Sequence, residues 1–243
     1  MEYKAYSFDL DDNLLKMPTK IYLEDSEGIK QAYSTLDFEK IRTRLDELGL
    51  KIIDESFASF EDDEQFMKDL GEATEAGSWG NLVNCVVKHA SIFAIITARG
   101  HAPETLKEGM KKIILERLSL EQLDKFKLKF SERTGTDYGS KTHEEVLGIY
   151  LNLCKFYPVS HSSIKEEFGH DKSTGMLKAA TFQEFRNYIH KYVKDNHGED
   201  VEIKVGFSDD SIANLSSIVN EMLKQHGLFF YHTKENSKKM DFI

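Results

Sequence analysis

The chain has 243 residues, of which 40% are apolar, and its formal net charge is −10. A chain of this size can form one large domain, or a catalytic domain that carries a smaller inserted module. The negative charge disfavours non-specific binding to nucleic-acid backbones, which requires clustered Lys and Arg side chains. No apolar run approaches the roughly 20 residues that a membrane helix needs, and the N-terminus lacks the pattern of a secretion signal.

The two cysteines, Cys85 and Cys154, lie far apart in segments of helical character. For such a pair, two buried thiols in a reducing compartment are favoured over a single disulfide. We therefore expect a cytoplasmic protein that associates with no membrane.

The first half of the chain contains strand-like and helical patterns in succession. Residues 4–10 alternate and are rich in aromatics, which predicts a strand. Two short strand-like runs, at residues 20–23 and 29–33, flank a turn sequence and predict a hairpin. Helices predicted from apolar residues at helical spacing occupy residues 37–48, 62–75 and 81–89.

The second half begins with a continuous apolar run at residues 92–96, which predicts a strand buried on both faces of a parallel sheet. Residues 126–130 are also interpreted as a strand. The remaining predicted strands are 156–160, 201–207 and 228–232, and the remaining predicted helices are 103–118, 142–153, 180–194 and 212–225. The polar residues after Thr233 are expected to be loosely held. Strands that alternate with helices indicate an open, mostly parallel, doubly wound α/β sheet of the Rossmann-like type.

Polar residues follow three of the predicted strands, where ligands bind in an open α/β sheet. These residues are Asp9, Asp11 and Asp12 after the first strand, Thr97 after the buried strand, and Asp209 and Asp210 after the strand at 201–207. Turn chemistry alone can explain any one acidic strand end, but it does not explain all three in this order. Carboxylates placed together repel one another. A hard cation with oxygen ligands relieves the repulsion, and Mg²⁺ fits best.

These segments resemble the haloacid dehalogenase-like hydrolase superfamily. Its first motif, an apolar strand followed by Asp-x-Asp-x-Thr, is matched at residues 6–13 except that Asn13 replaces the Thr. Its second motif, an apolar strand that ends in Thr or Ser, is matched at residues 95–97. Its fourth motif, an apolar strand followed by acids, is matched at residues 205–214. We expect the Asn13 amide to brace the loop through hydrogen bonds, as the usual Thr does.

The resemblance implies a magnesium-dependent phosphatase that works through an aspartyl-phosphate. Asp9 would attack phosphorus, and Asp11 would protonate the leaving oxygen and then activate water. Family members that break carbon–halogen bonds usually lack an acid at this second position, so Asp11 points to phosphoryl transfer. The expected Mg²⁺ ligands are Asp9, the backbone carbonyl of Asp11, and either Asp209 or Asp210, because the register of that pair is ambiguous.

Phosphate oxygens would be bound by Thr97 and by a lysine that precedes the last motif. Lys178 is the first choice for this lysine and Lys172 is the second. Ala98 and Arg99, which follow Thr97, are further candidates for substrate binding, although an Arg after a strand is more often a surface residue.

In this family an insertion over the active site, the cap, selects the substrate. Residues 17–79 are long enough for a small cap, which leaves 1–16 and 80–243 as the catalytic core, and residues 130–175 are a second place for an insertion. The expected substrate is a small phosphorylated metabolite or nucleotide. The alternatives are a phosphatase of phosphoprotein or of nucleic-acid ends, a mutase, and an inactive binding module on the same fold.

Overall fold

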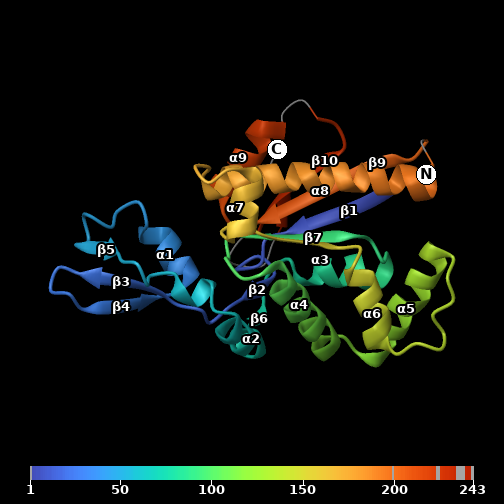
Figure 1. The fold of residues 1–243 in the computed structure, drawn as a ribbon, viewed down its shortest axis with the longest axis horizontal. Coiled ribbons are helices and arrows are strands. Elements are labelled where there is room, and N and C mark those ends of the chain that lie inside the picture. The colour runs from blue at the N-terminus through green and yellow to red at the C-terminus, as the bar shows by residue number, and fades with distance from the viewer. Residues whose placement is uncertain (1, 199, 223–224, 234–238, 242–243) are drawn as a thin grey trace.

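The structure is a computed structural model that describes residues 2–198, 200–222, 225–233 and 239–241. Its centre is a six-stranded sheet in the order β11-β10-β9-β1-β7-β8 (Figure 1). The strands are β1 (Glu2–Phe8), β7 (Phe93–Thr97), β8 (Lys155–Pro158), β9 (Glu202–Asp209), β10 (Leu228–Thr233) and β11 (Lys239–Asp241). All neighbours pair in parallel except β11, which pairs antiparallel with β10. The predicted open, mostly parallel α/β sheet is therefore confirmed.

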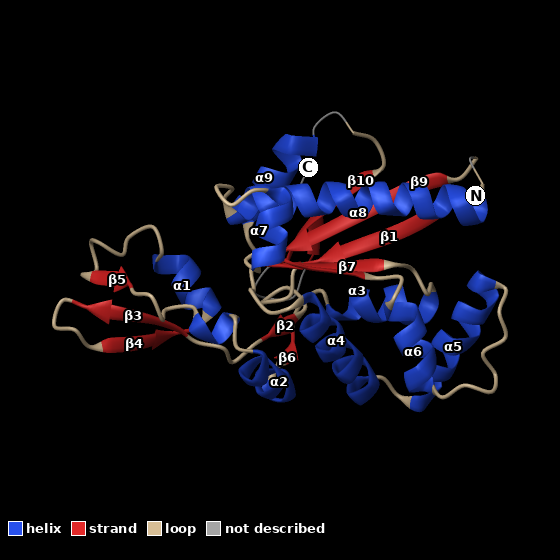
Figure 2. Cartoon of the chain, in the orientation of Figure 1, coloured by secondary structure: helices blue, strands red, loops and turns tan. Residues whose placement is uncertain are grey.

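Helices cover both faces of this sheet (Figure 2). One face is covered by α2 (Asp63–Glu72), α3 (Trp79–Val83) with the π-helical residues Asn84–Lys88, α4 (Pro103–Arg117), α5 (Leu120–Thr134) and α6 (His143–Leu151). The other face is covered by α7 (Ser162–Phe168), α8 (Thr174–His197) and α9 (Ile212–Met222). Successive side chains of β7 enter opposite cores, which explains its continuous apolar sequence. Phe93 and Ile95 face the first group of helices, while Ala94 and Ile96 face the second.

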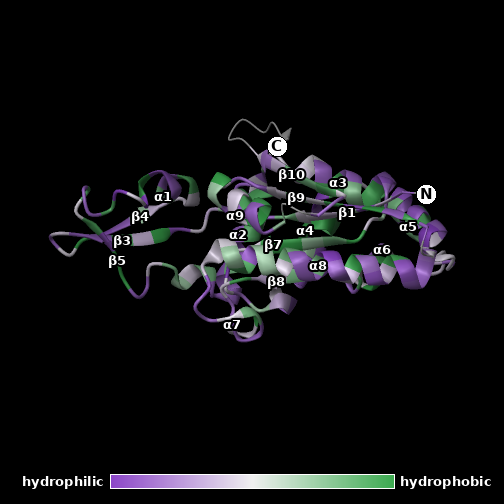
Figure 3. Cartoon of the chain, turned by 90° about the horizontal axis from the view of Figure 1, so that it is seen from above, coloured by the Kyte–Doolittle hydropathy of each residue, from purple (hydrophilic) through white to green (hydrophobic). Residues whose placement is uncertain are grey.

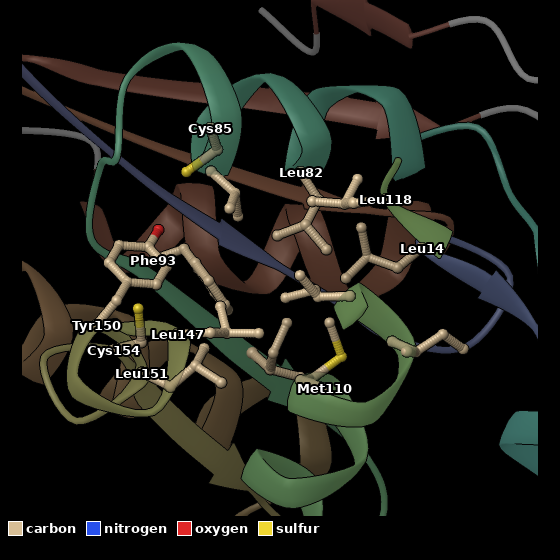
Figure 4. Packing of buried hydrophobic residues seen from close by; sticks show 14 of the residues in the cluster. Leu14, Leu82, Cys85, Phe93, Met110, Leu118, Leu147, Tyr150, Leu151 and Cys154 are labelled. Atoms are coloured by element: carbon tan, nitrogen blue, oxygen red, sulfur yellow. The ribbon is translucent and has the colours of Figure 1, made fainter. Parts of the chain in front are cut away.

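Figure 4 shows the first of these cores, in which side chains from several helices close over the sheet. Phe93 of β7 lies beside Tyr150 of α6, with ring centroids 6.0 Å apart. Met110 from α4 and Leu147 from α6 belong to the same buried cluster. This packing fixes β7 against the helices that follow it, and so holds the polar residues at its carboxyl end in place.

The order of the strands brings together the three strand ends that carry the candidate polar residues. β1 lies between β9 and β7, and its last residue, Phe8, pairs with Ser208 on one side and Ile95 on the other. After β8 the chain crosses back through α8 to reach β9 on the opposite side of β1. The carboxyl ends of β1, β7 and β9 therefore meet where the strand order reverses, which is where open α/β sheets bind ligands.

A small lobe, residues 19–61, projects from this end of the sheet (Figures 1 and 3). It contains α1 (Thr35–Ile41), a short 3₁₀ helix (Ala58–Phe60) and a second, antiparallel sheet. The strands of that sheet, in the order β4-β3-β5, are β3 (Ile21–Asp25), β4 (Lys30–Tyr33) and β5 (Leu50–Ile52). The lobe has its own small core, formed by Ile21, Leu23 and Leu50.

The rest of the predicted insertion at 17–79 returns to the main body. β6 (Thr74–Glu75) pairs antiparallel with β2 (Leu15–Lys16), the short strand that directly precedes the insertion. Phe66 and Leu70 of α2 and Trp79 of α3 are buried in the main core. Residues 130–175 also contribute to the central layers, because they include β8, which pairs with β7 at the edge of the sheet.

The predicted strand at residues 126–130 is wrong, because these residues form part of α5. The sequence Phe-Lys-Leu-Lys-Phe alternates as a half-buried strand would. Phe126 and Phe130 are, however, also one helical turn apart, and their rings stack with centroids 5.9 Å apart inside the core. Leu128 lies off that face and is 63% exposed.

The largest of the other differences from the prediction concern two helices and the C-terminal tail. The helix expected at 37–48 ends at Ile41, and turns continue the chain to Gly49, which has a left-handed φ of 65°. The helix expected at 180–194 begins earlier, at Thr174, because the Ser173 side chain caps it by accepting a hydrogen bond from the Met176 N–H. Within the C-terminal tail, residues 239–241 form β11 instead of a loose end, and residues 234–238 lie outside the described part of the chain.

Two further expectations concern the cysteines and the membrane. Cys85 and Cys154 are both buried, as predicted. In the part of the chain that the structure describes, none of the helices combines the length and the apolar character needed to cross a bilayer.

Candidate functional site

Asp9 is the first residue after β1, and its side chain is buried. Its backbone N–H donates to the Ser208 carbonyl at 2.9 Å, which continues the β1–β9 pairing by one residue. Asp12 adopts a left-handed φ of 57°, and its N–H donates to the Leu15 carbonyl at 2.7 Å. This tight turn reverses the chain directly after Asp9 and Asp11, and keeps both carboxylates at the end of the sheet.

Lys178 reaches the same place from the second turn of α8, and it is fully buried. Its Nζ lies 2.7 Å from Asp9 Oδ1 and 2.7 Å from Asp209 Oδ2. Lys172 is in the loop before α8, with its side chain beside Gly169. Of the two candidate lysines, only Lys178 contacts these carboxylates among the described residues.

The two acidic residues at the end of β9 lie in different environments. Asp209 has no exposed surface, and it accepts hydrogen bonds from the Ser211 N–H at 2.8 Å and from the Asn214 amide at 3.3 Å. Asp210 is half-buried and faces the cavity described below. One carboxylate oxygen each from Asp9, Asp209 and Asp210 lie within 4.8 Å of one another.

Burial of this cluster makes the charged forms of its carboxylates unfavourable. Burial raises the pKa of Asp9 to about 8, with Lys178 opposing the shift and Asp209 adding to it. Burial, together with Asp9 and Asp209, raises the pKa of Asp210 to about 9. Burial also works against the charged form of Lys178, but the Asp209 and Asp9 carboxylates outweigh it and raise the lysine pKa. One ammonium group cannot neutralise three carboxylates, so this donor set fits a hard divalent cation.

Thr97 ends β7 and is fully buried. Its side-chain oxygen accepts a hydrogen bond from the Arg99 N–H at 3.3 Å, and its carbonyl accepts from the Val159 N–H at 2.8 Å. Ala98 and Gly100 line the cavity. The second predicted strand end therefore contributes to the cavity through Ala98 and Gly100, whereas Thr97 itself is not among the lining residues.

Arg99 lies in the interior and not on the surface. Its Nε and Nη2 donate to the two carboxylate oxygens of Asp11 at 2.9 and 2.7 Å. Nη2 also donates to Thr19 Oγ1 at 2.8 Å, and Nη1 lies 3.2 Å from His101 Nε2. Its guanidinium carbon lies 4.8 Å from the centre of the Phe60 ring. Arg99 was expected to bind substrate or to lie on the surface, but the structure directs its guanidinium group to Asp11.

The side chain of Asn13 braces the loop, as expected, through partners that the sequence did not reveal. Its amide nitrogen donates to the Asp9 carbonyl at 2.9 Å and to the Ser208 carbonyl at 3.1 Å. Its amide oxygen accepts from Ser78 Oγ at 2.8 Å and from Thr233 Oγ1 at 2.5 Å. Ser78 directly precedes α3, and Ser208 and Thr233 lie at the ends of β9 and β10, so no local spacing could have identified these three partners.

A cavity of about 440 Å³ lies between the carboxylate cluster and the lobe. The core contributes Asp9, Asp11, Asp12, Ala98, Gly100, Ser160, Lys165, Thr174, Lys178, Asp210, Ser211 and Asn214. The lobe contributes Ile21, Thr35, Phe38, Glu39, Arg42, Phe57, Phe60 and Glu61. Thr35 Oγ1 donates to the Asp12 carboxylate, which joins the start of α1 to the loop after β1. The lobe therefore forms one wall of the candidate site.

No protein-family model, curated protein or solved structure matches this chain.

Proposed function

We propose that the protein is a magnesium-dependent phosphatase that hydrolyses a phosphate monoester through an aspartyl-phosphate on Asp9. The observation that carries the proposal is the buried contact of Lys178 with Asp9 and Asp209 at the floor of a cavity. A buried carboxylate beside a lysine and two further acids suits a nucleophile that must approach a negatively charged phosphate. The motif resemblance supports the same chemistry.

The donor set supports a bound Mg²⁺. Asp9 and Asp210 would hold the ion together with the Asp11 backbone carbonyl. Asp210 is preferred over Asp209, because the Asp209 oxygens are already bonded to Lys178, Ser211 and Asn214. When bound, Mg²⁺ would shield the negative charge between the attacking carboxylate and the phosphate.

The side chains divide the two chemical steps between them. An Asp9 oxygen attacks phosphorus, the bond from phosphorus to the leaving oxygen breaks, and Asp11 gives that oxygen its proton. Asp11 then takes a proton from water, whose oxygen attacks phosphorus, so that inorganic phosphate leaves and Asp9 is regenerated. Lys178 and Thr97 would bind phosphate oxygens as charge develops. Asp11 must release at least one of its two bonds to Arg99 in order to carry the proton.

The lobe would act as the cap of this enzyme. It contributes Ile21, Phe38, Phe57 and Phe60 to the lining of the cavity and so supplies most of its apolar surface. A walled cavity of this kind favours a small substrate over the phosphorylated end of a polymer, which needs an open groove.

The proposal is tested by hydrolysis of p-nitrophenyl phosphate with and without Mg²⁺. We expect metal-dependent turnover by the wild type and none by Asp9→Asn. Asp54→Asn, which changes an exposed carboxylate of the lobe, is the matched control and keeps the wild-type rate. Equal turnover by wild type and Asp9→Asn would overturn the proposed nucleophile. Ligand binding that Asp9→Asn leaves unchanged, with no turnover by the wild type, would instead favour a binding module.

A further inference from the structure

We infer that the lobe wall of the cavity binds an aromatic ring, so that the substrate is a small phosphate monoester whose alcohol part carries a planar heteroaromatic ring. The part of this inference that concerns the phosphate group rests on the proposed function. The part that concerns the ring rests on the lobe side chains alone, and the preference for a ring can be measured separately.

Three phenylalanine side chains of the lobe line the cavity: Phe38, Phe57 and Phe60. The Phe38 and Phe57 rings meet edge to face with centroids 5.5 Å apart, and the Phe57 and Phe60 rings do so at 6.1 Å. Phe57 is 37% exposed although it lies in a concave surface. An apolar wall with exposed aromatic surface inside a cavity is typical of a small-molecule site.

This wall favours a ring over a sugar or an alkyl chain. Sugar hydroxyls would lose hydrogen bonds to water against phenyl rings, whereas a planar ring gains the edge-to-face or offset contacts that aromatic pairs prefer. Glu39 and Glu61 line the same cavity; Glu39 pairs with Arg42 at 2.9 Å, and the Glu61 carboxylate can accept hydrogen bonds from ring N–H groups. A heteroaromatic ring with such donors therefore fits better than a plain phenyl group.

The size of the cavity and the position of its basic groups agree with this substrate class. A volume of about 440 Å³ exceeds what a phosphate group needs, and it falls in the range of roughly 300–1,000 Å³ for small-molecule sites. Lys165 lines the cavity on the core side, and its ammonium group has no carboxylate partner among the described residues. Phosphate at Lys178 and a ring at Phe57 would place the ester bond between the two walls.

The test compares adenosine 5′-monophosphate with ribose 5-phosphate. Both carry the phosphate ester on the 5′ oxygen of ribose, and only the nucleotide carries the adenine ring. We expect kcat/KM to favour the nucleotide by about tenfold or more, the size that one base–aromatic stacking contact provides. Phe57→Leu and Phe38→Leu should each bring this ratio closer to one. Phe229→Leu, a matched change at a 41% exposed phenylalanine of β10 outside the cavity, should leave the ratio unchanged.

Equal kcat/KM for the two esters would overturn the inference, as would a preference that both lobe variants retain. If wild type hydrolyses p-nitrophenyl phosphate through Asp9 but shows no ring preference, only this inference fails. If no ester is hydrolysed, the proposed function fails, and the Kd values of the same two compounds for Asp9→Asn decide the inference. Tighter binding of the nucleotide would then support it, and equal or absent binding would overturn it.

Discussion

The guanidinium group of Arg99 pairs with both carboxylate oxygens of Asp11, at 2.9 and 2.7 Å, in the interior of the fold. Arg99 also donates to Thr19, where the chain enters the lobe, and lies against Phe60, where the chain leaves it. The side chain of Arg99 thus links Asp11, the proposed proton donor, to both segments that connect the lobe to the main body. Arg99 is a positioning residue in this account, because it acts through Asp11.

Replacing Arg99 by Lys should lower the free energy of unfolding by roughly 2–4 kcal/mol, because the two-pronged contact with Asp11 and the bond to Thr19 are lost in a buried setting. Urea denaturation measures this change. Arg44→Lys is the control, since the Arg44 side chain is 61% exposed and pairs with Glu47 on the lobe surface, where such pairs contribute roughly 0–1 kcal/mol. Equal losses in the two variants would contradict the role given to Arg99.

Replacing Lys178 by Met should lower kcat by roughly 10²–10³, by analogy with the loss of one donor to a developing oxyanion. The same change leaves Asp9 and Asp209 without their cation, so added Mg²⁺ should raise the melting temperature of the variant more than that of the wild type. Lys172→Met is the matched control, and we expect it to retain activity. A larger loss of activity in Lys172→Met would show that the wrong lysine is assigned.

Stability of the metal-free protein should depend on pH through Asp9 and Asp210. The pKa of each is higher in the folded chain than in the unfolded chain, so the folded state binds more protons between about pH 4 and about pH 8–9. The free energy of unfolding therefore falls as pH rises through this window. Denaturation in EDTA from pH 5 to pH 8 measures the slope. Asp210→Asn should make it shallower, while a flat profile for the wild type would contradict the strained carboxylate cluster.

Asn13→Ala should lower the free energy of unfolding by roughly 2–4 kcal/mol, because Ser78, Thr233 and two backbone carbonyls lose a buried partner. Thermal or urea denaturation reports the loss. Asn187→Ala, an exposed change on α8, serves as the control and should cost far less. Similar values for the two variants would mean that the network around Asn13 does not hold the loop.

The central sheet and its strand ends were predictable because their signals are local. The apolar run at 92–96 is continuous because both faces of β7 are covered, and the acids after β1 and β9 follow strands directly. Parallel pairing then brings Asp9 and Asp209 to the same edge without any further information. Lys178 was the first of two candidates, since Lys172 also precedes β9, and only the tertiary contacts separate the two lysines.

The remaining features depend on contacts between distant segments. Nothing near Arg99 in the sequence indicates that it pairs with Asp11, because the two residues meet only when β1 and β7 lie side by side. The partners of Asn13 and the aromatic wall of the lobe are likewise set by the tertiary fold. The error at 126–130 arose because five alternating residues fit a strand, whereas the one-turn spacing of Phe126 and Phe130 needs a longer window to be recognised.

Detection of a phosphoryl group on Asp9 tests the central claim most directly. Mg²⁺-loaded Asp11→Asn would be mixed with p-nitrophenyl phosphate, quenched in acid, digested and examined by mass spectrometry. The nitrophenolate leaves without needing a proton, but hydrolysis of the intermediate lacks its base, so the intermediate should accumulate. We predict a burst of about one nitrophenolate per protein molecule and a phosphoryl group on the peptide that contains Asp9. A phosphoryl group on another residue, or Mg²⁺-dependent turnover by Asp9→Asn at the wild-type rate, would contradict the account.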